Sequence, residues 1–134
     1  MGPKGFVVAC LLALPLAACG SSARANDAAA VSERFHAALE SGDAKAACAD
    51  LGEETLSSLE QQEGKPCVKS ILSMKIPKGA SAAARQVAIT SAYVRLKGGS
   101  SDFLDEGPDG WKISAAGCRP SSSPEQPQDC EVEG

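Results

Sequence analysis

The chain has 134 residues, of which 43% are hydrophobic and 22% are charged, and its formal net charge is −4 at pH 7. This length limits the chain to one small domain. Lys and Arg form no cluster in the sequence, which argues against nucleic acid as a partner and against electrostatic docking on anionic lipid.

The first 18 residues are typical of an export signal. Lys4 supplies a positive charge, an apolar run extends from Phe6 to Leu16, and the small residues Ala17-Ala18 precede the predicted cut. The run is shorter than the roughly 20 apolar residues that a membrane-spanning helix needs. We therefore expect residues 1–18 to be a signal peptide that is removed.

The sequence Leu16-Ala17-Ala18-Cys19-Gly20 at the predicted cut resembles the lipobox of bacterial lipoproteins. This resemblance implies that Cys19 becomes a diacylglyceryl, N-acyl cysteine, which anchors the protein to the extracytoplasmic face of the cell membrane. Two acyl chains give lasting attachment, whereas a single chain binds only marginally. The alternative is an ordinary secretory signal with a chance cysteine at the cut.

Six cysteines are present, and loss of Cys10 with the signal and acylation of Cys19 leave four of them. An even number in an exported chain predicts two disulfides, for which three pairings are open. We favour the two pairings that close short loops, each contributing roughly 3 kcal/mol. These pairings are Cys48 with Cys67 and Cys118 with Cys130.

The segment after Cys19 begins with small polar residues, so we interpret residues 19–27 as a lipidated tether. An amphipathic helix is then predicted from about Ala28 to Ser41, because Val31, Phe35 and Leu39 recur at four-residue spacing. Ser32, which neighbours this stripe, is assigned to the polar side of the helix.

Three more helices are predicted in the next 35 residues or so. Asp43 is a natural N-cap for the first of them, which Gly52 ends. The second covers Glu53–Gln62. The third covers Cys67–Met74, with its apolar side chains directed inward: Val68, Ile71 and Leu72.

Beyond Pro77 the apolar period falls from about four to two, which indicates strands. Turns are predicted at Gly98-Gly99 and at Gly107–Gly110. The expected strands contain Val87 with Ile89, then Tyr93–Lys97, then Phe103-Leu104, and finally Trp111–Ala115. The tail, residues 119–134, is rich in Pro and Ser, and we expect Cys130 to tie it back.

Helices followed by strands predict an α+β domain over residues 28–118, in which a small curved antiparallel sheet packs on N-terminal helices. Several segments together carry a resemblance to a known family: Glu33–Leu39, Gly42-Asp43, Ala46–Cys48, Gly110–Ile113, Ala116–Cys118 with Pro120, and Asp129–Gly134. They resemble the cone-shaped NTF2-like superfamily, and more narrowly its small actinobacterial lipoproteins of uncharacterised function. That resemblance implies a pocket enclosed by helices and sheet, used for catalysis in some relatives and for association in others.

No catalytic residue is predicted. His36 is the only histidine, so any Ser/His/Asp or Cys/His arrangement would have to use it, and we expect it to be a partly exposed helix residue. The isomerase-like members of the superfamily use a pocket carboxylate and a tyrosine. Here Asp102 or Asp105 could serve with Tyr93, but these carboxylates lie near turns, where solvated side chains are expected.

The candidate pocket residues are Tyr93, Trp111 and Phe35, although a tryptophan at the start of a strand usually fills the core. No close pair of metal ligands is present, so no metal or other cofactor is predicted. We favour a non-enzymatic domain that binds an envelope protein or a small apolar ligand. The alternatives are an isomerase-like or dehydratase-like enzyme and a structural spacer.

Overall fold

The computed structural model describes residues 2, 18–123, 125 and 128–134, with Ala18 and Cys19 described by their backbone only. The predicted signal peptide, including Cys10, lies outside the described residues apart from Gly2 and the Ala18 backbone. Within the described part, no helix is both long and apolar enough to cross a membrane.

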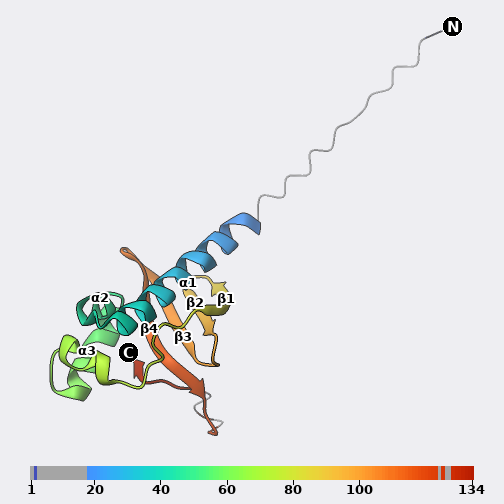
Figure 1. The fold of residues 1–134 in the computed structure, drawn as a ribbon. Coiled ribbons are helices and arrows are strands. Elements are labelled where there is room, and N and C mark those ends of the chain that lie inside the picture. The colour runs from blue at the N-terminus through green and yellow to red at the C-terminus, as the bar shows by residue number, and fades with distance from the viewer. Residues whose placement is uncertain (1, 3–17, 124, 126–127) are drawn as a thin grey trace.

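The fold is α+β, as predicted, with helices followed by an antiparallel sheet. Figure 1 shows α1 crossing the sheet, with α2 and α3 gathered at its C-terminal end. The helices are α1 (Ala18–Ser41), α2 (Ala44–Ala49) and α3 (Glu53–Glu63), followed by the 3-10 turns η1 (Cys67–Lys69) and η2 (Ile71–Ser73). The strands are β1 (Ala82–Ala88), β2 (Ser91–Leu96), β3 (Ser101–Gly107), β4 (Gly110–Pro120), β5 (Gln128–Asp129) and β6 (Val132–Glu133).

α1 begins earlier than predicted, because the segment interpreted as a tether, residues 19–27, is helical. Alanines and the absence of Gly or Pro between Ser21 and Ser41 favour a continuous helix. Arg24 also fastens this segment to the sheet. Its Nη2 donates to the carbonyl of Ile89 at 2.5 Å and pairs with Glu106, and its guanidinium lies 5.5 Å from the centre of the Trp111 ring.

The buried face of α1 carries the predicted stripe. Val31, Phe35 and Leu39 are 8%, 0% and 2% exposed, and each such burial is worth roughly 1.5 to 3 kcal/mol. Ser32, which was predicted on the polar side, is also fully buried on this face. The helix ends before Gly42, which has a φ of 75°, a left-handed conformation that glycine adopts easily.

The helix predicted over Cys67–Met74 is replaced by η1 and η2. Ser70 and Ser73 donate their hydroxyls to backbone carbonyls three residues earlier, a local bond that competes with regular helix. Ile71 is buried as predicted, but Val68 is 47% exposed, so its predicted inward direction is wrong. The disulfide Cys48–Cys67 joins α2 to η1, which is the favoured pairing.

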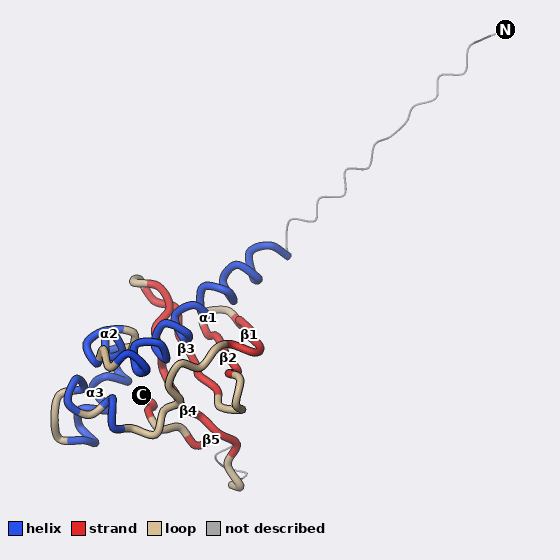
Figure 2. Tube along the Cα trace, viewed as in Figure 1, coloured by secondary structure: helices blue, strands red, loops and turns tan. Residues whose placement is uncertain are grey.

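The sheet has the order β1-β2-β3-β4-β5, with β6 also paired to β4 (Figure 2). Ala92, Val94 and Leu96 of β2 are buried against the core, and the residues between them face the other way. β1 ends at Ala88, which pairs with Ser91, so Ile89 lies in the turn and not in the predicted strand.

The tail after β4 is held to the sheet. β5 pairs with the C-terminal end of β4, β6 pairs with its middle at Ala115 and Ala116, and a disulfide joins Cys118 to Cys130. Val132 of β6 is 2% exposed and belongs to the core. The predicted bridge and the predicted attachment of the tail are therefore both present.

Candidate functional site

A buried polar cluster joins α1 to the sheet. It consists of Ser32 and His36 from α1 and Asp102 from β3, and each of the three is 0% exposed. Ser32 and His36 share one helix face because they are four residues apart. Asp102 pairs in register with the inward residue Val94, and this register directs its carboxylate toward α1.

The carboxylate of Asp102 receives three hydrogen bonds. Its Oδ2 accepts from Ser32 Oγ at 2.5 Å and lies 2.7 Å from His36 Nε2. Its Oδ1 accepts from the backbone N–H of Gly117 at 3.2 Å. On the other side of the imidazole, Nδ1 lies 2.5 Å from the carbonyl oxygen of Pro77. The cluster thus connects α1, β3, β4 and the loop that precedes β1.

These partners favour the cationic form of His36. A carbonyl oxygen and an ionised carboxylate are both acceptors, and an imidazolium that donates from both ring nitrogens satisfies them together. Burial by itself would lower the pKa of His36, but the hydrogen bond and negative charge of Asp102 and the Pro77 carbonyl outweigh it and raise the pKa. The pair is therefore a buried ion pair with its hydrogen-bonding capacity used.

This arrangement lacks the geometry of a catalytic triad, although it contains Ser, His and Asp. Ser32 donates to Asp102 and not to the imidazole, and His36 has no free lone pair with which to take a proton. All three side chains are sealed from solvent. The cluster therefore has a structural role, because it links α1 to the sheet inside the core. The predicted partial exposure of His36 and the predicted solvation of Asp102 are both wrong, whereas Asp105 is exposed.

The candidate pocket of Tyr93, Trp111 and Phe35 does not form among the described residues. Phe35 and Trp111 are 0% and 6% exposed and belong to the core between α1 and the sheet. Tyr93 alternates with the inward residues of β2 and lies on the opposite face, where its ring is 5.3 Å from that of Phe103. Its hydroxyl accepts from Ser101 Oγ at 2.8 Å.

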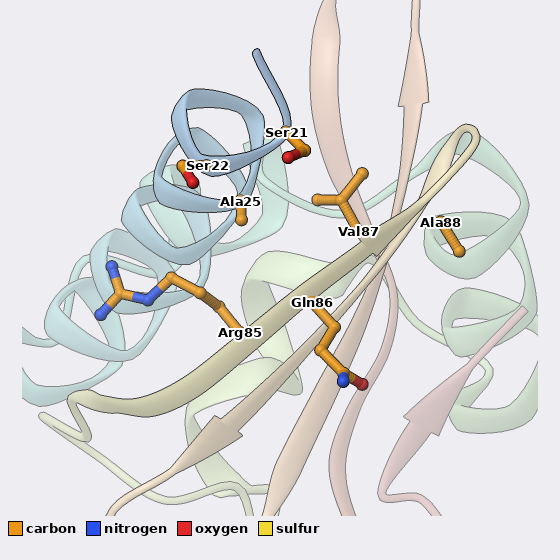
Figure 3. Close-up of a pocket in the computed structure, with 7 residues that line it drawn as sticks. All are labelled: Ser21, Ser22, Ala25, Arg85, Gln86, Val87 and Ala88. Atoms are coloured by element: carbon orange, nitrogen blue, oxygen red, sulfur yellow. The ribbon is translucent and has the colours of Figure 1, made fainter. Parts of the chain in front are cut away.

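Two shallow depressions lie at opposite ends of α1. One is formed by the first turns of α1 and by β1, with the residues that Figure 3 labels: Ser21, Ser22, Ala25, Arg85, Gln86, Val87 and Ala88. The other is largely apolar and surrounds the Cys48–Cys67 bridge, beside the half-exposed Val68. Its remaining lining residues are Lys45, Ala49, Leu56, Glu60 and Pro66.

Among the described residues, no group of three or more His, Cys, Asp or Glu side chains could hold a metal ion. Comparisons with protein-family models, with curated proteins and with solved structures found no match for the chain. A functional proposal therefore depends on this chain's own residues.

Proposed function

We propose that the chain is an extracytoplasmic lipoprotein, anchored to the membrane through lipid on Cys19, whose small domain is a non-catalytic binding module for an envelope protein. The fold of this module is proposed to be of the NTF2-like type, because helices precede an antiparallel sheet and the segments that resemble this superfamily extend from α1 to beyond β6.

The pairing of the four domain cysteines is the observation that supports lipidation of Cys19. Cys48 bonds to Cys67 and Cys118 to Cys130, so none of these four needs Cys19 as a disulfide partner. Two structural disulfides also fit an exported chain, because cytosolic thiols are usually kept reduced. Cys19 then stands in a lipobox-like sequence at the start of α1, where acylation accounts for it.

The length of α1 supports a role at a distance from the membrane. At about 1.5 Å per residue, the C-terminal end of α1 at Ser41 lies about 33 Å along the helix axis from the Cys19 backbone, and the apolar depression is formed by the elements that follow this end. The depression is too open to surround a small molecule, because small-ligand sites bury most of the ligand surface. An apolar patch of this shape suits a protein partner.

The buried cluster supports the non-catalytic part. His36 is the only histidine in the sequence, and both its nitrogens are occupied inside the core. Tyr93 and Asp102 lie on different faces of the sheet, so they do not form the acid and donor pair of an isomerase.

Replacing Cys19 with Ala is expected to abolish incorporation of labelled fatty acid and to release the protein from the membrane fraction. The reason is that only this cysteine follows the lipobox-like sequence. The matched control is Cys10→Ala, which should keep the label because it changes only the apolar run. Persistent label on Cys19→Ala would overturn the anchor.

Replacing Val68 with Asp is expected to remove the main product of chemical crosslinking between the lipidated protein and envelope proteins in intact cells. A charge in the apolar depression opposes burial there, while the fold is untouched because Val68 is 47% exposed. Gln61→Asp, on α3 outside the depression, should leave the crosslink unchanged. Equal crosslinking in both variants would contradict this binding surface.

A further inference from the structure

We infer that Ile89, in the turn between β1 and β2, inserts its side chain into the surface of the same bilayer that holds Cys19. This inference rests on the proposed lipidation of Cys19 and adds to it a second, non-covalent membrane contact that fixes how the domain stands on the bilayer.

Ile89 is unusual in both exposure and backbone conformation. Its side chain is 87% exposed, the most of any large hydrophobic residue in the described part of the chain, where Val68 is the other exposed one. Its φ is 55°, a left-handed conformation that β-branched residues rarely adopt and that favours Gly or Asn. Such strain concentrates at functional positions, because a residue without a role there is easily replaced.

The turn lies at the anchored end of α1. Arg24, five positions after Cys19, donates to the carbonyl oxygen of Ile89 at 2.5 Å. The Arg24 backbone lies about 7.5 Å along the helix axis from Cys19, at about 1.5 Å per residue, and Ala88 next to Ile89 lines the same depression as Ser21 and Ser22. Figure 3 shows Ser21 of α1 and Val87 and Ala88 of β1 at this same end of the domain.

A bilayer suits this end better than a protein partner does. The headgroup layer of each leaflet is roughly 5 to 8 Å thick, so an acylated Cys19 brings the turn within reach of it. Ile89 stands alone between Ala88 and Thr90, and polar side chains such as Ser21, Ser22 and Gln86 interrupt the apolar surface of the adjoining depression, so a shaped protein contact has no continuous apolar area to use. A fluid bilayer accepts a single apolar side chain without a complementary surface.

The charges nearby indicate apolar insertion and not attraction to anionic lipid. Arg24 is paired with Glu106, Arg85 of β1 donates to Asn26 Oδ1 at 3.0 Å, and Asp105 accepts from Ser91 Oγ at 2.8 Å, so the positive charge of Arg85 is balanced in number by the negative charge of Asp105. Asp109 at the adjacent β3–β4 turn is exposed and adds negative charge. We therefore expect the contact to form on zwitterionic phosphatidylcholine.

The test uses tryptophan fluorescence of the lipidated protein, purified from its membrane and incorporated into phosphatidylcholine vesicles with or without bromine on the acyl chains. Ile89→Trp should show an added emission that brominated lipid quenches at least twofold. Val68→Trp is the matched control, because Val68 is exposed at the far end of α1, and its added emission should be unquenched. The wild type gives the background of the buried Trp111.

Thr90→Trp provides a second probe that keeps Ile89, and it should also be quenched. Equal quenching of the Ile89→Trp and Val68→Trp variants, in protein that floats with the vesicles, would overturn the membrane contact and leave the lipid anchor standing. Protein that fails to float and lacks the acyl mass on Cys19 would overturn both.

Discussion

Replacing Asp102 with Asn is expected to lower the free energy of unfolding by about 3 kcal/mol, the cost typical of removing one partner from a buried ion pair. The substitution leaves the His36 imidazolium without its counter-charge in a site that is sealed from water. In the wild-type chain the Gly117 N–H donates to a carboxylate oxygen of Asp102. An asparagine side chain has only one acceptor oxygen in place of two, so it cannot accept from all three of the donors that Asp102 serves. Urea denaturation with linear extrapolation measures the loss.

The matched control for this substitution is Asp105→Asn on the same strand. Asp105 is exposed and bonds only to the Ser91 hydroxyl, so its replacement should change stability by no more than about 0.5 kcal/mol. Equal effects of the two substitutions would show that the buried pair does not hold α1 to the sheet.

The pH dependence of stability provides an independent readout of the same pair. Because the pKa of His36 is raised in the folded protein, the folded state binds this proton more tightly than the unfolded chain does. The stabilisation is therefore complete below the unfolded value of about 6.5 and is lost as pH rises through the folded-state pKa. Asp102→Asn should flatten this decline, and an unchanged slope would contradict the assigned charge state.

Removing the Cys48–Cys67 bridge by changing both residues to Ala is expected to lower the free energy of unfolding by about 3 kcal/mol. The bridge closes a loop with a sequence separation of 19, and this closure lowers the conformational entropy of the unfolded chain, which stabilises the folded state. Both cysteines are buried, so their loss also leaves space beside α2 and η1. Thermal and urea unfolding of the purified domain in oxidising buffer measure the effect.

The second bridge serves as the comparison for the first. Cys118–Cys130 has a sequence separation of 12, so its removal should cost nearly as much, but the exchange of amide hydrogens should rise chiefly in β5, which it holds against β4. A loss of less than about 1 kcal/mol for both variants would mean that packing alone maintains the fold.

Local patterns were enough to predict much of this fold. The Val31, Phe35 and Leu39 stripe, the cysteine pairing and the order of helices and strands all follow from spacing along the chain. The stripe and the strands depend on residues that are near neighbours in sequence, where helical and strand periods constrain side-chain directions. The two bridges close short loops, with sequence separations of 19 and 12.

The buried cluster depends on contacts that sequence spacing does not reveal. His36 and Asp102 are 66 residues apart and meet only because of how α1 crosses β3. One signal was available, since Ser32 and His36 stand four residues apart beside the apolar stripe and therefore share a helix face. The helical start of α1 was missed although its alanines favour helix, because the small polar residues were interpreted as a tether and the contacts of Arg24 with the distant sheet do not show in the sequence.

The most direct test of the central claim is mass spectrometry of the N-terminal peptide of the protein isolated from its membrane. The proposed anchor predicts a peptide that begins at Cys19 and carries the mass of a diacylglyceryl group, with or without a further acyl chain. A peptide with an unmodified Cys19 thiol, or one that still contains residues before it, would contradict the claim.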